Sequence, residues 1–391
     1  MRQLPERSKQ RRPQQLLVAP GAFKHSMSAA AAAGAIARGL RASSLGLPLL
    51  SFPIADGGNG TLDAFLSHGG TRHERTVRSP LGAPVSAAYG LLPVGKTAVI
   101  EMALASGLEL IDTLDARSAS TYGTGELIRA ALEGGSRKII VGLGGSATTD
   151  GGAGCLQALG LRLIDRAGHE IPPGGSGLSQ IAEIDMAGLH PGLQNTEIIV
   201  AADVDNPAVG INGAAAVFGP QKGANPEDVA VLDAALSHWF AHTREVTGRD
   251  VSRIPGSGAA GALAGGLIAY AHASIQSGVD LLLDHIGFDD ALTQARLVIT
   301  GEGKLDSQSL SGKGPIGVAR RAQARGIEVV AFAGSVTVDP ESLRKFGIQA
   351  AWPIVDSIMT LEYALTHGAE LLERAALRLG NTLAIQIKGK S

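Results

Sequence analysis

Residues 139–152 read IIVGLGGSATTDGG, and they join an apolar run to a loop of glycines and hydroxyl residues. Three branched apolar residues in a row are typical of a buried strand, and the glycines that follow let the backbone turn sharply. The next residues, from about Ala153, have the apolar spacing of a helix. This order of strand, loop and helix predicts an α/β fold in which loop N–H groups and a helix N-terminus point at phosphate oxygens.

Apolar strands followed by polar loops recur toward both ends of the chain. Residues 16–20 read LLVAP and precede an alanine-rich helix expected from Ser28 to Leu40. A second strand, at about 49–55, leads through a glycine-rich loop into a helix from Thr61. Three more apolar strands are expected at 297–300, 328–333 and 350–354. Strands that alternate with helices in this way predict a parallel sheet.

The middle of the chain has a different pattern. A hairpin is expected from Val85–Leu92 and Thr97–Met102, which breaks the alternation of strands and helices. Alternation then resumes with strands at Lys138–Leu143 and Thr196–Ala202. Asn225-Pro226-Glu227 combines an N-cap, a proline at the first helical position and an acidic first turn, so it predicts a helix that reaches Thr247.

These patterns predict two α/β domains, because 391 residues exceed the roughly 250–300 that one core organises. A Rossmann-like domain with a parallel sheet is expected to be interrupted by an inserted mixed α/β domain. Residues 1–14 carry five basic residues without periodicity, and they predict a disordered tail. The expected division is 15–75 plus 285–391 for the first domain and 76–284 for the inserted one.

Composition points to a small-molecule partner. The 34 basic residues nearly balance 36 acidic ones, so no long-range field favours nucleic acid or an anionic membrane. No apolar run approaches the roughly 18 residues that cross a membrane, which favours a cytoplasmic protein. The single cysteine, Cys155, is expected in the core. Glycine occupies 53 positions, about double the usual share, which indicates tight loops near a ligand. The sequence leaves the oligomeric state open.

The glycine loop by itself allows more than one function. Gly142-x-Gly144-x-x-Ala147, with Asp165 about 20 residues on, matches the dinucleotide fingerprint of an NAD-dependent oxidoreductase. Asp150 argues against that interpretation, because a carboxylate beside a pyrophosphate is repelled unless a divalent cation lies between them. A non-catalytic regulator that binds a small ligand is the third alternative.

Charged residues follow several of the expected strands. Lys24, Asp56, Asp203 and Lys304 each lie in a loop that follows an apolar run. In α/β folds the carboxyl ends of the strands are where ligands bind. Asp203-Val204-Asp205 concentrates carboxylates, which phosphoryl transfer uses to hold Mg²⁺ and to orient the attacking hydroxyl. Lys222 and Lys304 lie in tight turns and can neutralise a phosphate or a carboxylate.

The motifs together resemble the type-1 glycerate kinase family over about residues 16–385. They comprise ADGGxGT at 55–61, EMAxASGL at 101–108, GTGELI at 123–128, GGSATxDGGAG at 144–154, DVxNP at 203–207, FGPQKGA at 218–224, GAAG at 258–261 and ITGEGKLD at 299–306. Eight motifs in the family's order make the resemblance specific.

The resemblance implies an ATP- and Mg²⁺-dependent kinase that phosphorylates D-glycerate to 2-phosphoglycerate, with the site in the cleft between two α/β domains. Our hypothesis for the site has three parts. The catalytic residues are Asp203, Asp56, Lys24 and Lys304. The residues that bind the nucleotide are Gly144, Gly145, Ser146, Thr148 and Lys222. The metal ligands are Asp150 and Asp205.

Three positions depart from the pattern of the family that the chain resembles. His25 stands where glycine is usual, Asn59 where glutamate is usual, and Thr149 where asparagine is usual. Asn59 has the largest consequence, because it removes a charge beside Asp56. An amide accepts a hydrogen bond from a substrate hydroxyl, but it cannot act as a base and it holds a cation less well.

Overall fold

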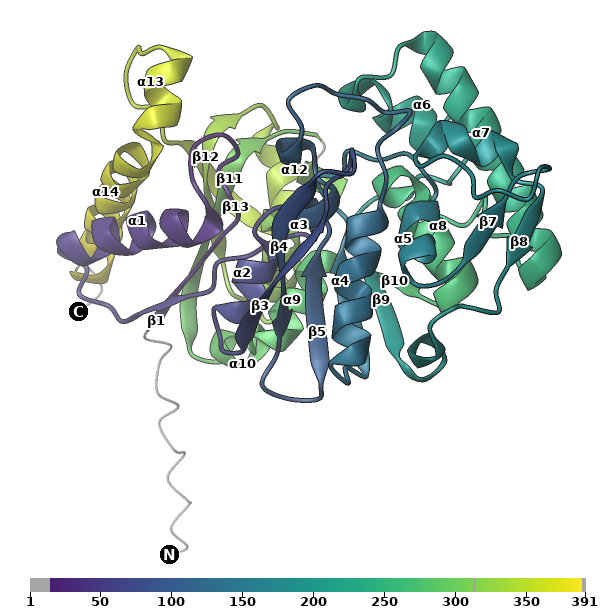
Figure 1. Ribbon diagram of the computed structural model, residues 1–391. Helices are drawn as coiled ribbons and strands as arrows, with labels where there is room; N and C mark the ends of the chain where they lie inside the picture. Colours follow the sequence, from purple (N-terminus) through teal and green to yellow (C-terminus); the bar gives the residue numbers. More distant parts are fainter. Residues whose placement is uncertain (1–14, 308, 312–313, 389–391) are drawn as a thin grey trace, which may run out of the picture. The chain divides into compact units, whose positions relative to one another are not determined.

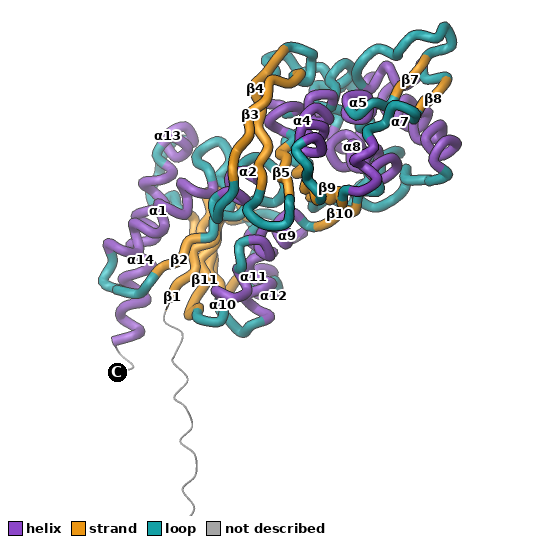
Figure 2. The backbone as a smooth tube through the Cα atoms, turned by 60° about the horizontal axis from the view of Figure 1, so that its bottom comes forward, coloured by secondary structure: helices purple, strands orange, loops and turns teal. Residues whose placement is uncertain are grey.

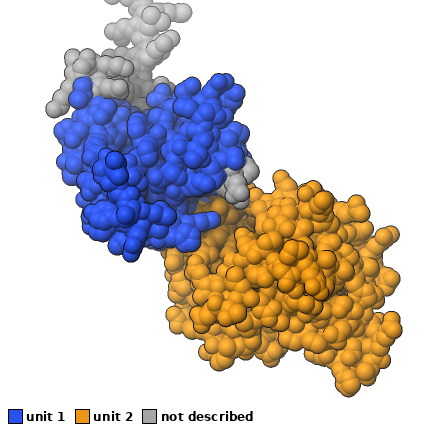
Figure 3. Space-filling view, turned by 90° about the horizontal axis from the view of Figure 1, so that it is seen from above, with its two compact units in different colours: residues 1–54, 283–391 blue, residues 55–282 orange. Residues whose placement is uncertain are grey.

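The computed structural model describes residues 15–307, 309–311 and 314–388, so the basic tail predicted at 1–14 lies outside the described residues. The chain forms two compact units (Figures 1 and 3). The first unit comprises residues 1–54 and 283–391, and the second comprises residues 55–282. None of the helices in the described part of the chain is long and apolar enough to cross a membrane.

The first unit contains a five-stranded sheet in the order β13-β12-β11-β1-β2, with all neighbours parallel. Its strands are β1 (Gln15–Pro20), β2 (Leu49–Ser51), β11 (Ala295–Leu305), β12 (Val329–Val336) and β13 (Ile348–Pro353). Its helices are α1 (Ala29–Ala42), α10 (Phe288–Leu292), α11 (Pro315–Ala324), α12 (Pro340–Lys345), α13 (Leu361–Thr366) and α14 (Gly368–Lys388). Figure 2 shows α1 and α14 on one face of the sheet and α10 to α12 on the other. The sheet is therefore covered on both faces, as a parallel sheet requires.

Helices α1 and α14 pack closely because of a glycine. A Cβ atom at Gly39 would lie 2.1 Å from the backbone oxygen of Glu373, so only a residue without a side chain fits this contact. Ser28 caps α1 by accepting a hydrogen bond from the N–H of Ala31. Ile36 of α1 and Leu372 of α14 then join the buried core of the sheet.

The second unit contains a six-stranded mixed sheet in the order β10-β9-β6-β5-β4-β3. Its strands are β3 (Thr71–Arg78), β4 (Pro84–Leu91), β5 (Thr97–Glu101), β6 (Lys138–Gly142), β9 (Glu197–Ala201) and β10 (Ser274–Gln276). β3, β4 and β5 are antiparallel neighbours, whereas β5, β6, β9 and β10 are parallel. A separate two-stranded sheet is formed by β7 (Arg162–Ile164) and β8 (Glu183–Asp185). The expected combination of a parallel-sheet domain and a mixed α/β domain is confirmed.

The second unit contains eight α-helices in the described part of the chain. They are α2 (Thr61–Leu66), α3 (Ala103–Ser106), α4 (Tyr122–Glu133), α5 (Ala153–Ala158), α6 (Ala214–Phe218), α7 (Pro226–Thr247), α8 (Ala259–Ala271) and α9 (Gly278–His285), the last of which runs into the first unit. Asn225 and Asp228 form a capping box at the start of α7, as the sequence indicates. Cys155 is fully buried among the apolar side chains of this unit.

The division into units differs from the expected one at its first boundary. Residues 55–75 were expected in the same domain as β1, but they lie in the second unit. The reason is local. Glu101 at the end of β5 accepts hydrogen bonds from the N–H groups of Gly60 and Leu62 and so fixes the start of α2. β3 then pairs with β4 along its whole length.

Candidate active site

The carboxyl ends of four parallel strands lie side by side in the second unit. The register pairs Glu101 of β5 with Gly142 of β6, Gly142 with Ala201 of β9, and Ala201 with Gln276 of β10. The loops that leave these strands therefore start from one edge of the sheet. This edge is where α/β folds bind their ligands.

Three loops touch one another at this edge. The N–H of Gly144 donates to the backbone oxygen of Gly57 at 2.9 Å. A Cβ atom at Gly144 would lie 2.4 Å from the Cα of Gly58, and one at Gly57 would lie 2.5 Å from the oxygen of Ala201. The loop that carries Asp56 is thus pressed against both the glycine loop and the end of β9. The glycines are needed because side chains would separate these backbones.

Gly145 is the exposed residue of the turn in the glycine loop, and its neighbour Ser146 is buried, with 7% of its surface exposed. Gly145 has a φ of 76°, a left-handed conformation that favours glycine. Its oxygen accepts from the N–H of Leu108, and the neighbouring N–H of Ala147 donates to Ser106. Within the described part of the chain, the N–H groups of Gly145 and Ser146 donate to no protein acceptor. Successive N–H groups without a protein acceptor can form a cradle for an anion, and Gly145 is the exposed member of this pair.

Lys222 lies beneath this turn and is only 1% exposed. Its Nζ donates to Oγ of Ser146 at 2.9 Å and to the backbone oxygen of Thr148 at 2.5 Å. Burial lowers the pKa of this amine to about 7, and the charge of Asp150 acts in the opposite direction. The turn sequence suggested an exposed cation that meets phosphate directly. The structure instead gives Lys222 a buried position against the loop. The side chain of Thr148 is buried as well.

Asp150 also differs from its expected place. Its side chain is fully buried and accepts four hydrogen bonds, from the N–H and Oγ1 of Thr121 and from the N–H groups of Gly152 and Gly154. Burial raises the pKa of this carboxyl, while the bonds from Thr121 act against the rise. With both oxygens satisfied inside the protein, Asp150 stabilises the loop and is not presented to a solvent-borne metal.

Asp203 and Asp56 are half-buried at the sheet edge. Asp203 is the second residue after the end of β9, and Asp56 accepts a long hydrogen bond from the N–H of Gly58 at 3.3 Å. Asp205 is exposed. Asn206 holds the following turn through a hydrogen bond from Nδ2 to the oxygen of Asn212. The carboxylates of Asp203 and Asp56 are therefore only partly solvated, and that of Asp205 is exposed to solvent.

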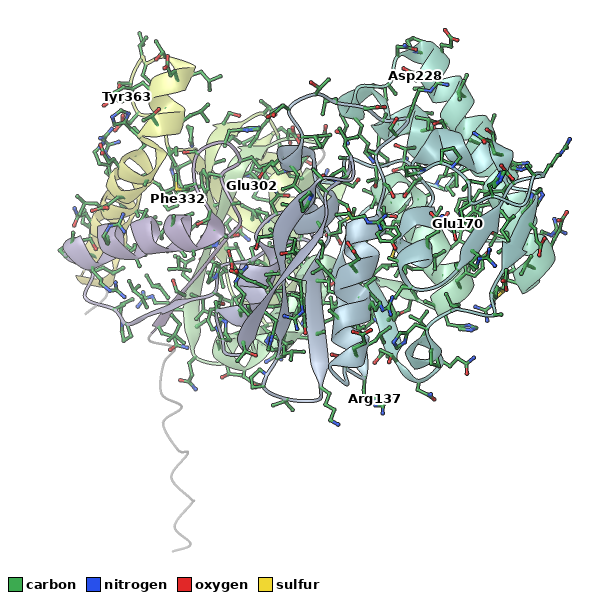
Figure 4. The ribbon with its side chains drawn as sticks, in the orientation of Figure 1. Arg137, Glu170, Asp228, Glu302, Phe332 and Tyr363 are labelled. Carbon is green, nitrogen blue, oxygen red and sulfur yellow. The ribbon has the colours of Figure 1, made fainter. Side chains whose placement is uncertain are left out.

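Lys24 and Lys304 lie together in the first unit. Pro20 at the end of β1 pairs with Gly301 of β11, and a Cβ atom at Gly303 would come within 3.1 Å of the backbone nitrogen of Lys24. Both lysine side chains are exposed, and Nζ of Lys304 lies 3.1 Å from Oδ2 of Asp306. Glu302 on β11 and Phe332 on β12 mark this strand end in Figure 4. The first unit thus presents two cations at one strand edge.

Glu101 is a site residue that the sequence-based hypothesis left out. It is 4% exposed, and burial raises the pKa of its carboxyl against the hydrogen bonds from Leu62 and Gly60. It anchors the loop that carries Asp56. The signal was present in the EMAxASGL motif, where an acidic residue ends an apolar strand. Asn59, on the same loop, donates from Nδ2 to Oε1 of Glu109 at 2.8 Å, so a carboxylate still stands beside this position.

The structure does not support the interpretation of Gly142, Gly144 and Asp165 as a dinucleotide site. Asp165 follows β7, which belongs to the separate two-stranded sheet and does not neighbour β6. Its side chain accepts from the N–H groups of Ala167 and His169, which lowers the pKa of the carboxyl and closes a turn. In a dinucleotide site the acidic residue ends a strand beside the glycine loop. Asp165 is therefore a turn residue.

Comparison with known proteins agrees with this geometry. A model of the glycerate kinase family matches residues 16–384. A glycerate kinase of Bacillus subtilis is 46% identical over 92% of this chain and 95% of its own length. A glycerate 2-kinase of Escherichia coli is 43% identical over 95% of this chain and 99% of its own. A crystal structure assigned as glycerate kinase 2 of Salmonella typhimurium LT2 aligns with a TM-score of 0.84 and 42% identity, covering 96% of this chain and 99% of that one. The chain belongs to the glycerate kinase family and is a glycerate kinase.

Proposed function

We propose that this glycerate kinase transfers the γ-phosphoryl group of ATP to the 2-hydroxyl of D-glycerate, with Mg²⁺, and yields 2-phospho-D-glycerate and ADP. The observation that carries the proposal is the turn of the glycine loop at the exposed Gly145, where the N–H groups of Gly145 and Ser146 have no protein acceptor in the described part of the chain. The name of the Escherichia coli relative, glycerate 2-kinase, supports the choice of the 2-hydroxyl.

The donor phosphates are proposed to bind on the glycine loop. Gly144 brings the loop against Gly57, and the N–H groups of Gly145 and Ser146 donate to phosphate oxygens. Thr148 and Lys222 are proposed to support the loop from its buried side. Both are buried, and the amine of Lys222 donates a hydrogen bond to the backbone oxygen of Thr148. This loop supplies donors in fixed directions, which is the main protein contribution to phosphoryl transfer.

Magnesium fits the carboxylates near the loop. Mg²⁺ is held in kinases by one or two carboxylates together with substrate phosphates, so a complete protein cage is not required. No group of three or more His, Cys, Asp or Glu residues is gathered as a metal site in the described ranges. Asp205 and one of Asp203 and Asp56 are the proposed ligands, whereas the buried Asp150 keeps its internal bonds. Bound Mg²⁺ would neutralise charge on the transferring phosphoryl group.

Asp203 is proposed to orient the 2-hydroxyl of D-glycerate and to accept its proton. The hydroxyl oxygen then bonds to the γ-phosphorus as the bond to the bridging oxygen of ADP breaks. A residue just past a buried strand is held more rigidly than one in mid-loop, which suits this role. Asp56 is the second candidate base. Lys24 and Lys304 are proposed to attract the glycerate carboxylate and the transferring phosphate.

The proposal is tested by ADP release with four acceptors: D-glycerate, L-glycerate, glycerol and lactate. D-Glycerate should give the highest kcat/KM, because a charged site favours a small hydroxy acid over glycerol. Phosphorus NMR of the product then distinguishes the 2-phosphate from the 3-phosphate. A preference for glycerol would remove the role proposed for the lysines, and a 3-phosphate product would remove that proposed for the 2-hydroxyl.

A further inference from the structure

We infer that Lys222 is a positioning residue that holds the phosphate-binding turn from inside the protein and does not itself contact phosphate. The inference rests on the proposed function of the glycine loop. Its basis is the position of the amine, which lies on the buried side of the turn and bridges two points of it, Oγ of Ser146 and the backbone oxygen of Thr148.

The two halves of the glycine loop are held by different groups. The second half has its own anchors: Asp150 binds Thr121, Trp239 donates from Nε1 to the oxygen of Gly151 at 3.1 Å, and the N–H of Gly151 donates to Gly261. For residues 146–149, no other side chain in the described part of the protein donates a hydrogen bond. Lys222 is thus the side-chain support of the half that carries the cradle.

The local chain fixes where this amine can reach. Lys222 ends the short 3-10 turn Pro220–Lys222, and Gly223 follows in a left-handed conformation with φ of 92°. A Cβ atom at Gly223 would lie 2.7 Å from the side chain of Leu114, so the turn is packed against its neighbour. Pro220, Gln221 and Gly223 are exposed, so the turn lies at the surface and the Lys222 side chain is directed from it into the protein, where it is only 1% exposed.

Holding the turn matters because its N–H groups act by direction. The hydrogen bonds to Oγ of Ser146 and to the oxygen of Thr148 restrain the chain next to the N–H groups of Gly145 and Ser146. A displacement of about 1 Å in such a site reduces catalysis by up to about a hundredfold. Without the bridge, the turn keeps its backbone hydrogen bonds to Leu108 and Ser106 but loses its side-chain support and is expected to be less rigid.

The test compares the full-length wild type with Lys222→Met, Ser146→Ala and the double variant. Methionine has a similar length and no charge, so it removes the bridge and keeps the volume. We expect the KM for ATP to rise about tenfold or more while the KM for D-glycerate stays within about twofold. Ser146→Ala should raise the KM for ATP less, and the double variant should resemble Lys222→Met, because both changes break one bridge.

Amide hydrogen exchange of the nucleotide-free protein measures directly whether Lys222 holds the loop. Segment 142–149 should exchange faster in Lys222→Met than in the wild type. The matched control is Lys138→Met, at the other end of the strand that feeds the loop, where Nζ lies 3.5 Å from Glu197 in a partly exposed pair. It should change neither exchange of the loop nor the KM for ATP.

The outcomes separate the two proposals. If Lys222→Met lowers ATP affinity but leaves exchange of the nucleotide-free loop unchanged, or if its effect adds to that of Ser146→Ala, Lys222 touches phosphate directly and the inference is wrong. If the wild type does not bind ATP, the proposed function fails, while the exchange comparison still decides the role of Lys222. If Lys222→Met does not fold, Ser146→Ala must still speed exchange of segment 142–149, and no change there overturns the inference.

Discussion

Replacing Lys222 by methionine should change how the stability of the second unit depends on pH. Burial lowers the pKa of this amine from 10.5 to about 7. The unfolded chain therefore binds more protons than the folded chain between these two values, and stability rises with pH across that window. Below pH 7 both states are protonated, so the full penalty of burying the charge is present.

The magnitude follows from one proton. A full proton difference changes the free energy of unfolding by about 1.4 kcal/mol per pH unit. Between pH about 7 and pH about 8.5 the folded amine loses most of its remaining proton, and the integrated gain is about 1.6 kcal/mol. The upper limit is chosen because burial raises the pKa of the Cys155 thiol, which makes stability fall with pH once the unfolded thiol ionises.

The assay is urea unfolding followed by tryptophan fluorescence. The chain has two tryptophans, and in a Trp352→Phe background the remaining one, Trp239, is fully buried in the second unit. The wild type should gain stability from pH 7 to 8.5 relative to Lys222→Met, since other titrating groups cancel in the difference. Lys222→Met should equal or exceed the wild type at pH 7, because an apolar replacement for a buried charge is often neutral or stabilising. A flat or falling difference would refute the assignment of a perturbed, buried amine.

Three other substitutions test the site. Gly145→Val should weaken ATP binding far more than D-glycerate binding, because its Cβ would lie 2.4 Å from Oδ1 of Asn59 and block the cradle; equal nucleotide affinity in a folded variant would contradict this. Asp203→Asn should lower kcat by about a hundredfold or more with an unchanged melting temperature, and near-native turnover at saturating substrates would make it structural. Gly261→Ala should destabilise by about 3 kcal/mol or more, because φ is 64° and its Cβ would lie 2.0 Å from a backbone oxygen; Gly248→Ala, with φ of 72° and open space, should lose only about 1 kcal/mol, and equal losses would contradict the steric argument.

The sheet edge could be predicted from sequence because its signals are local. The strand expected at Lys138–Leu143 is observed at Lys138–Gly142, and the helix expected to reach Thr247 ends there. Apolar runs, glycines and caps act over a few residues, so they predict strands and helices whatever the tertiary fold. The placement of Thr61–Leu66 failed because a short helix after a strand looks the same in either domain. Contacts between residues far apart in the sequence decide the placement, such as the one between Leu62 and Glu101, 39 residues away.

Site chemistry was less predictable, because a residue type does not reveal its burial. Lysine and aspartate are rarely buried, so Lys222 and Asp150 were assigned to a nucleotide and a metal on the assumption that they face solvent. The structure places both inside the second unit, where each is satisfied by hydrogen bonds. Glu101 was missed for the same reason: its role depends on two N–H groups that a linear sequence does not bring near it.

The burial of Asp150 also decides which part of the loop is available to phosphate. A glycine loop that leads into a helix suggests that the anion binds at the helix N-terminus. Here the carboxylate of Asp150 accepts from the N–H groups of Gly152 and Gly154, at the start of α5, and thereby occupies the donors that an anion would need. Its negative charge at the same place would repel phosphate. Several residues earlier, Gly145 is the exposed residue of the loop, and its N–H has no protein acceptor in the described part of the chain. Anion binding is therefore expected at the turn supported by Lys222, and the helix start serves to hold the loop.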